Sequence, residues 1–156
     1  MGDMAAIGNS NDKDIAYLTG VNMGTYLSEL GFNLDFAPVV DVSGGVSNPV
    51  IGRRSFSSEP EIVSKMAAAL SSGLEDKGIV SVYKHFPGHG STVGDPHKGY
   101  AYTNKSIEDM KECDLIPFQH GIDENVSMIM VGHISTPNIV KDGTPASLSR
   151  AIIKEL

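Results

Sequence analysis

The sequence predicts an α/β fold with parallel strands, and more specifically a partial (β/α)₈ TIM barrel. Three short apolar segments rich in β-branched or aromatic residues, at 32–40, 79–86 and 127–133, are predicted as buried strands. Their centres lie roughly 45 residues apart, which leaves room for a helical crossover between successive parallel strands. The glycine- and histidine-rich segments follow these strands, at the edge where barrels carry their binding sites. A doubly wound sheet also fits the alternation of elements.

Helices are predicted between these strands from apolar residues at helical spacing. The first covers 15–30 and ends near Gly31, and the second covers 62–74 and ends near Gly78. Ser106 and Asp109 form a capping pair for a third helix, and Pro117 starts a fourth because proline is tolerated only in a first turn. A last helix begins near Leu148. A complete barrel needs about 250 residues. We therefore interpret residues 1–156 as a single fragment of a barrel domain, with three to four βα units.

Composition excludes several classes of protein. The net charge is −7 and no basic cluster occurs, so nucleic acid is not an expected partner. No apolar run approaches the roughly 20 residues of a membrane span. Cys113 is the single cysteine, so no intrachain disulfide can form. Neither a cytoplasmic nor an exported location is favoured.

Asp95 and His97 are the first candidates for catalysis. Histidine titrates near neutral pH and can donate and accept a proton within one reaction cycle. A carboxylate bonded to its second ring nitrogen orients the ring and stabilises its charged form. Two positions apart with Pro96 between them, the two side chains are close enough for such a pair. A surface turn that carries an aspartate and a histidine is the alternative.

Candidate ligand-binding residues end or follow the three strands. Lys84 and His85 end the second strand, where a lysine within an apolar run indicates a polar, functional strand end. Asp41 follows the first strand and His133 ends the third. Of the two adjacent arginines 53 and 54, Arg54 is the candidate. The histidines also allow a metal site, but Pro87 and Gly88 rule out the helix that His-xxx-His spacing suits, so no metal is expected.

Taken together, four motifs resemble glycoside hydrolase family 3, in order and in spacing, over nearly the whole chain. They are Phe-Ala-Pro-Val-Val-Asp at 36–41, Asn-Pro-Val-Ile-Gly-Arg-Arg-Ser-Phe at 48–56, Lys-His-Phe-Pro-Gly-His-Gly at 84–90 and Asp-Pro-His at 95–97. The Asp-x-His loop resembles the bacterial β-N-acetylhexosaminidase branch, which includes enzymes acting on peptidoglycan fragments. Pro96 replaces the serine that is common in this loop and leaves both chemical residues in place.

This resemblance implies roles for particular residues. His97 corresponds to the acid/base of a retaining β-N-acetylglucosaminidase and Asp95 to its partner, while Arg54, Lys84 and His85 correspond to residues that hold N-acetylglucosamine. The family nucleophile is an aspartate in a Ser/Thr-Asp-Asp segment, which these 156 residues do not contain. No cofactor is implied.

Two further functions remain open on the sequence. A related enzyme that uses phosphate as acceptor would keep the same fold, and an inactive sugar-binding or truncated module would lack turnover altogether. A partial barrel also leaves strand edges unpaired, so either an oligomer that covers these edges or a rearrangement of the fragment is expected.

Overall fold

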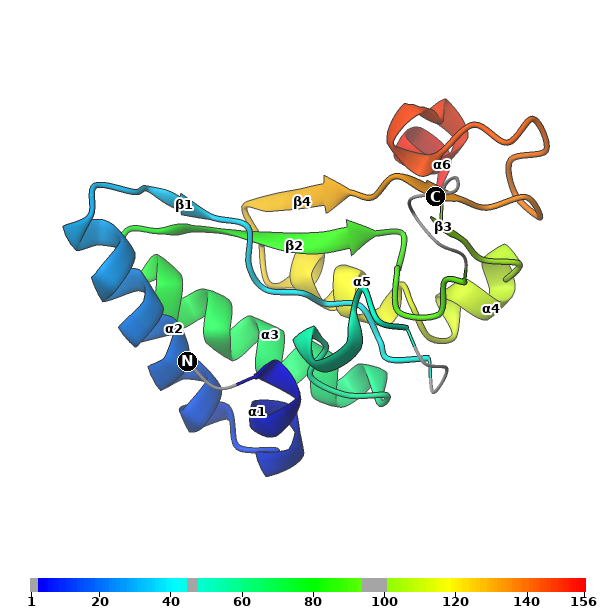
Figure 1. Cartoon of the computed structure of the whole chain (residues 1–156). Helices are drawn as coiled ribbons and strands as arrows, with labels where there is room; N and C mark the ends of the chain where they lie inside the picture. The colour runs from blue at the N-terminus through cyan, green and yellow to red at the C-terminus, as the bar shows by residue number, and fades with distance from the viewer. Residues whose placement is uncertain (1–2, 45–47, 94–100) are drawn as a thin grey trace.

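A parallel sheet with helices on one face forms the framework of the molecule (Figure 1). The computed structural model describes residues 3–44, 48–93 and 101–156. Its elements are α1 (Met4–Ser10), α2 (Lys13–Glu29), β1 (Leu34–Asp35), the 3₁₀ helix η1 (Gly52–Arg54), α3 (Pro60–Glu75), β2 (Val80–Phe86), β3 (Ala101–Tyr102), α4 (Ile107–Lys111), α5 (Ile116–Asp123), β4 (Met128–Val131), β5 (Ile134–Ser135), the 3₁₀ helix η2 (Ala146–Leu148) and α6 (Arg150–Glu155).

The strand order β1-β2-β4 follows the order in the chain, and both pairings are parallel. Helices α2, α3 and α5 lie on the same face of this sheet (Figure 1). A doubly wound sheet would carry helices on both faces, whereas consecutive strands backed by helices on one face are the arrangement of a barrel wall. The predicted parallel α/β fold is therefore confirmed.

The first predicted strand is shorter than expected. Regular pairing covers only Leu34–Asp35, and one isolated parallel bridge between Val39 and Lys84 continues it. From the pair Asp35–Ser81 to the pair Val39–Lys84 the chain advances four residues on the first strand and three on β2, so one extra residue interrupts the ladder. Pro38 lies in this stretch and has no N–H to donate. The third predicted strand ends at Val131, and the chain then forms β5, which pairs with β3 in a separate two-stranded sheet.

The predicted helices are all present. Ser106 accepts a hydrogen bond from the Asp109 N–H while the Asp109 side chain bonds back to the Ser106 N–H, which completes the predicted capping box. Pro117 lies in the first turn of α5, as expected. Gly31 and Gly78 both have positive φ angles after α2 and α3. The short helix α1 was not predicted.

Helix α3 carries the centre of the core. Its buried face packs toward β2, and the fully buried side chains there include Met66, Leu70 and Leu74 from the helix and Tyr83 from the strand. Phe118 of α5 completes this layer. Such burial contributes about 25 cal/mol for each Å² of apolar surface removed from water.

Helix α2 meets α3 through glycines and alanine rather than through its large apolar residues. Ala16, Gly20 and Gly24 are its buried residues, whereas Leu18 and Tyr26 are more than half exposed. A Cβ atom on Gly20 would lie 2.1 Å from the Leu70 carbonyl oxygen, so the two helix backbones approach as closely as glycine allows.

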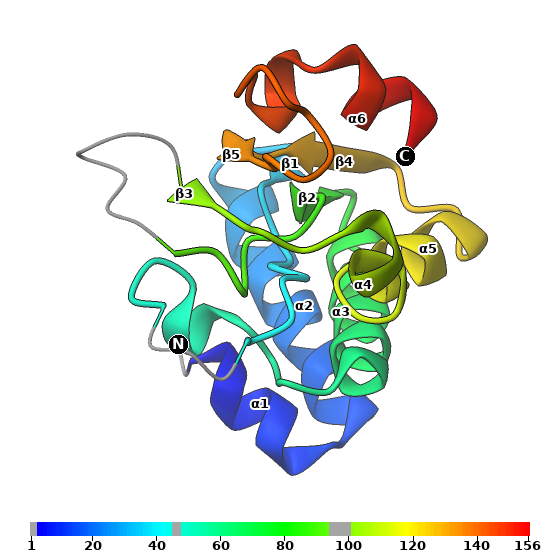
Figure 2. The ribbon, with the colours of Figure 1, turned by 90° about the vertical axis from the view of Figure 1, so that its right-hand side faces the viewer.

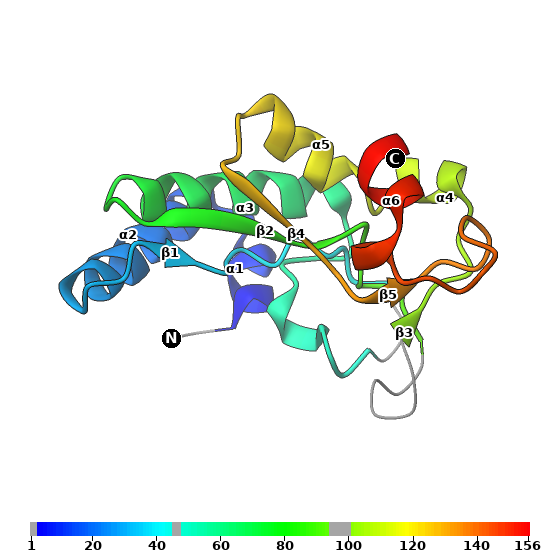
Figure 3. The same cartoon turned by 90° about the horizontal axis from the view of Figure 1, so that it is seen from above.

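Loops and short elements gather at the end of the molecule to which the strands point. Seen from above, β3, β5 and α6 lie at this end (Figure 3). No helix in the described parts of the chain has both the length and the apolar character required to cross a bilayer.

The close approach at Gly20 leads to a stability prediction. Alanine is the better helix former by about 1 kcal/mol, but its methyl group would collide with backbone that cannot move without separating α2 from α3. We expect Gly20→Ala to lower the free energy of unfolding by about 1–3 kcal/mol in urea titrations. Thr25→Ala, on the exposed side of the same helix, is the control and should stay within about 0.5 kcal/mol. A more stable Gly20→Ala protein would contradict the packing argument.

Candidate active site

The candidate site lies at the C-terminal ends of β1, β2 and β4, the end of the molecule that faces the viewer in Figure 2. Lys84 and His85 stand near the end of β2, Asp41 and Arg54 lie in the connection between β1 and α3, and His133 follows β4. Five of the seven residues expected in the site thus lie on segments at or after the strand ends.

Asp41 is the buried centre of this region. Its side chain has no exposed surface, and its Oδ1 accepts hydrogen bonds from the backbone N–H groups of His85 (3.2 Å) and His89 (2.6 Å). Its Oδ2 lies 2.8 Å from Nδ1 of His85. Asp41 is one of the candidate ligand-binding residues, and its contacts in the structure are with the two histidines.

A β-bulge positions His85. Lys84 pairs with Met130 and Phe86 with Val131, so β2 has one residue more than β4 between these pairs. A bulge breaks the regular alternation of side-chain directions along a strand. The His85 side chain keeps 18% of its surface exposed while its Nδ1 edge is held by Asp41.

Lys84 lies beside Arg54 in a groove of about 420 Å³ that is also lined by Phe36. Its ammonium group donates a hydrogen bond to the Phe36 carbonyl oxygen. Burial lowers the pKa of Lys84, the positive charge of Arg54 lowers it further, and Asp35 and Asp41 act in the opposite direction. Two cationic groups in one groove suit a ligand rich in oxygen atoms.

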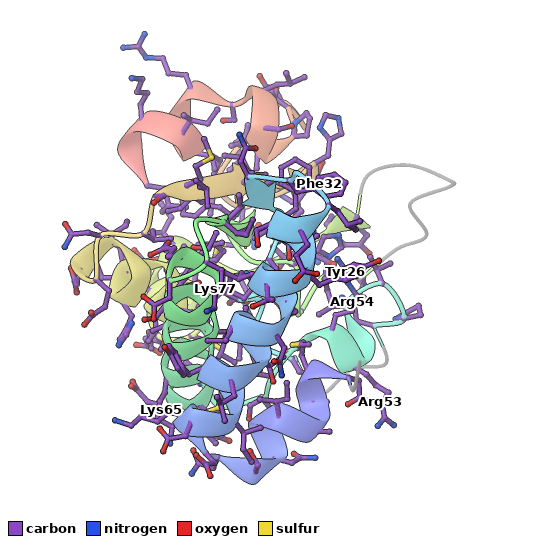
Figure 4. All side chains as sticks on the ribbon, turned by 90° about the vertical axis from the view of Figure 1, so that its left-hand side faces the viewer. Tyr26, Phe32, Arg53, Arg54, Lys65 and Lys77 are labelled. Atoms are coloured by element: carbon purple, nitrogen blue, oxygen red, sulfur yellow. The ribbon has the colours of Figure 1, made fainter. Side chains whose placement is uncertain are left out.

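The two adjacent arginines have different surroundings. Arg53 bonds and pairs with Asp3 at the surface, where this contact lowers the pKa of the aspartate. Arg54 is exposed and donates to the Val50 carbonyl oxygen at 2.9 Å, and both arginines line the groove that contains Lys84. In Figure 4 Arg53 points outward at the lower right of the view, below Arg54. Arg54 remains the candidate ligand residue of the pair, because Arg53 is engaged by Asp3.

Asp95 and His97 lie outside the described residues. Two described residues before and after the range 94–100, Val93 and Tyr102, exchange two backbone hydrogen bonds of 2.9 and 3.1 Å in an antiparallel bridge. Tyr102 belongs to β3, which pairs with β5 directly after His133. Val93 and Tyr102 are therefore joined to the strand-end region.

His133 is exposed, and its Nδ1 lies 2.5 Å from the Ser147 hydroxyl. His120 lies on α5, outside this region. Across the ranges 3–44, 48–93 and 101–156, no three His, Cys, Asp or Glu side chains converge in a group that would hold a metal ion.

Sequence reasoning gave no role to two polar residues that support the site. The Asn48 amide donates to the His89 carbonyl oxygen at 2.8 Å, while its own oxygen accepts from the Val50 N–H at 3.0 Å. An Asn-Pro pair after a strand is a signal for such a side-chain turn. Asp114 is almost fully buried, pairs with Lys105 and accepts from the Ser91 hydroxyl at 3.3 Å. Nothing local in the sequence distinguishes it from a surface aspartate.

Comparison with known proteins assigns this arrangement to a family. Residues 2–156 match the glycosyl hydrolase family 3 N terminal domain. The beta-hexosaminidase LpqI of Mycobacterium tuberculosis is 41% identical over 133 residues, which cover 85% of this chain and 34% of that protein. The beta-hexosaminidase of Hydrogenovibrio crunogenus is 36% identical over 159 residues, covering 100% of this chain and 44% of the relative.

A solved structure agrees with the sequence comparisons. NagZ from Neisseria gonorrhoeae, in complex with N-trifluoroacetyl-D-glucosamine, superposes with a TM-score of 0.88 at 35% identity. The match covers 100% of this chain and 47% of NagZ. The chain thus spans less than half the length of these relatives, and its parallel strands and helices form part of a barrel.

The shared groove of Arg54 and Lys84 generates a prediction about pKa values. Removing the guanidinium in Arg54→Ala should raise the pKa of Lys84, although burial should keep it below the ordinary value of 10.5. An NMR titration of the lysine side-chain signals measures this change. Arg53→Ala removes the same charge one residue earlier, where it pairs with Asp3, and should leave the Lys84 titration unchanged. Equal titrations in both variants would place Arg54 away from Lys84.

Proposed function

The chain belongs to glycosyl hydrolase family 3, and from this membership we propose that it forms part of the catalytic domain of a retaining β-N-acetylglucosaminidase. Such an enzyme hydrolyses terminal N-acetylglucosamine from β-glycosides. The observation that carries the proposal is the joint placement of Lys84, His85 and Arg54 around the strand ends, where Val93 and Tyr102 are also bridged. The relatives named beta-hexosaminidase support the substrate class.

Arg54, Lys84 and His85 are proposed to hold the sugar. Lys84 and Arg54 present N–H donors, which suit the hydroxyl and carbonyl oxygens of N-acetylglucosamine. Because the bulge and Asp41 orient His85, its ring is held before the sugar arrives, which reduces the entropy cost of binding. His133 is proposed to line the same cavity.

His97 is proposed as the acid/base and Asp95 as its partner. In the first step His97 gives its proton to the glycosidic oxygen as the bond to the leaving group breaks and a carboxylate nucleophile attacks the sugar. In the second step His97 takes a proton from water, which releases the sugar from the enzyme. The nucleophile is expected outside these 156 residues, so the chain alone is not expected to turn over substrate.

Replacing His97 tests this assignment in an enzyme that joins the chain to the nucleophile-bearing part of its barrel. His97→Ala should slow turnover of alkyl N-acetylglucosaminides by about 10²–10⁴-fold, the usual contribution of general acid–base catalysis. Aryl glycosides with good leaving groups should be affected less, because their bond breaks with little proton transfer. His120→Ala, a histidine on α5 outside the site, is the matched control. Unchanged hydrolysis of alkyl substrates would refute the role of His97.

The two outer edges of the sheet are proposed to mediate self-association of the isolated chain. In the part of the chain that the structure describes, β1 and β4 pair only with β2, so each keeps one unpaired edge. Exposed apolar side chains accompany these edges, namely Tyr26, Leu30, Phe32 and Phe36 near β1, and Ile122 and Met128 near β4. Figure 4 shows Tyr26 and Phe32 on the side of α2 away from Lys77. Unpaired edges with apolar neighbours favour edge-to-edge contact.

Light scattering after size-exclusion chromatography tests this association. The isolated chain should elute as a dimer or larger species, and Phe36→Lys should shift it toward the monomer, because charge at a strand edge opposes pairing. Ser58→Lys introduces the same charge at an exposed loop residue before α3 and should leave the elution unchanged. A monomeric wild-type chain at micromolar concentration would contradict the proposal.

A further inference from the structure

The buried carboxylate of Asp41 faces hydrogen-bond donors on both of its oxygens. Oδ1 accepts from two backbone N–H groups, those of His85 and His89. Oδ2 lies 2.8 Å from Nδ1 of the His85 ring, its one hydrogen-bond partner among the described residues. A carboxylate can only accept hydrogen bonds. The hydrogen between Oδ2 and Nδ1 must therefore come from the ring.

This contact determines the tautomer of His85. A neutral imidazole carries one proton, on either Nδ1 or Nε2. With Nδ1 occupied by the proton that faces Asp41, Nε2 is left as an unprotonated acceptor. Since Asp41 has no exposed surface and 18% of His85 is exposed, the ring is held at one edge and keeps accessible surface.

His89 lies on the same turn and has a different partner. Its Nδ1 lies 2.6 Å from the Thr92 hydroxyl oxygen, which is also 2.9 Å from the His89 carbonyl oxygen. The single hydrogen of this hydroxyl can point to either acceptor, so the contact does not determine the tautomer of His89. The two rings meet edge to face with their centroids 5.6 Å apart. Of these two histidines, His85 is the one whose ring nitrogen faces a carboxylate, and its tautomer is fixed by that contact.

We propose that Asp41 is a positioning residue that fixes His85 as the Nδ1-protonated tautomer, so that the Nε2 lone pair accepts a hydroxyl hydrogen of the sugar beside the donor Lys84. The identity of the ligand rests on the proposed function. The tautomer of His85 rests on its contact with Asp41. A sugar hydroxyl both donates and accepts, and Lys84 with His85 supplies one partner of each kind.

Nitrogen NMR of the chain tests the tautomer directly. At about two pH units above the ordinary histidine pKa of about 6.5, the wild-type His85 ring should carry its proton on Nδ1. Asp41→Asn keeps an oxygen for the two backbone donors but turns an NH₂ group toward Nδ1. The neutral ring must then accept at Nδ1, so its proton should move to Nε2. A carboxylate-to-amide exchange beside the histidine of a serine protease triad is known to impose the wrong tautomer in this way.

Two control variants separate this effect from a general loss of structure. Ser55→Ala removes the hydroxyl that donates to the Asp41 backbone carbonyl oxygen at 2.7 Å, and should leave His85 protonated on Nδ1. Thr92→Val removes the hydroxyl beside the His89 ring and should likewise leave His85 protonated on Nδ1. A loss caused only by disturbed packing would change His85 in Ser55→Ala as well, and that result would overturn the proposal.

The outcome for the tautomer and the outcome for catalysis can be told apart. A wild-type His85 protonated on Nε2, or an Asp41→Asn ring still protonated on Nδ1, would refute the positioning role whatever the activity. In the completed enzyme, Asp41→Asn should lower kcat/KM by about 10- to 100-fold, as expected when one buried hydrogen bond to substrate is mispaired. If the wild-type enzyme does not hydrolyse N-acetylglucosaminides, the proposed function fails while the tautomer result stands.

Discussion

A carboxylate without any exposed surface is tolerable only when donors surround it, because an unpaired buried charge costs several kcal/mol. Asp41 meets this condition with two backbone N–H groups and one histidine ring, all from the residues that end or follow β2. The chain after β1 and the turn after β2 therefore cannot move independently. His85, the residue of the bulge, is held between the strand ladder and this carboxylate. The Ser55 hydroxyl donates to the Asp41 backbone carbonyl oxygen, so the segment that carries Arg54 is joined to the same residue.

The helical layer supports the site without taking part in it. The backbone contact between Gly20 and α3 brings α2 close to α3, and α3 in turn packs its apolar face toward β2. Asp114, just before α5, packs closely against the turn after β2. A Cβ atom on Gly88 in that turn would lie 2.6 Å from the Asp114 side chain. Changes in the helices should thus act on stability first, while changes near Asp41 act on the orientation of His85.

Much of the fold could be predicted because periodicity and capping are local properties of the chain. The helix start at Ser106 and the strand that ends in Lys84 and His85 are examples. The break in β1 could not be predicted, because it depends on the register between this strand and β2. The roles of Asp41 and Asp114 could not be predicted, because each accepts hydrogen bonds from residues that are distant in the sequence or on another element. Arg53 and Arg54 are adjacent and alike in sequence, and their different partners, Asp3 for Arg53 and the Val50 carbonyl oxygen for Arg54, are visible only in the structure.

The contacts that orient the proposed sugar-binding groups come from this chain itself. His85 is oriented by Asp41, Arg54 by the Val50 carbonyl oxygen and Lys84 by the Phe36 carbonyl oxygen. Preorganised donors and acceptors lower the cost of binding because little reorganisation remains when the ligand arrives. In the proposed enzyme, this part of the barrel would then recognise the sugar and move protons, while the nucleophile would come from another part of the barrel. Such a division would account for an ordered set of sugar-binding side chains in a chain that spans less than half the length of the relatives it matches. The nucleophile would complete the reaction from the other part of the barrel.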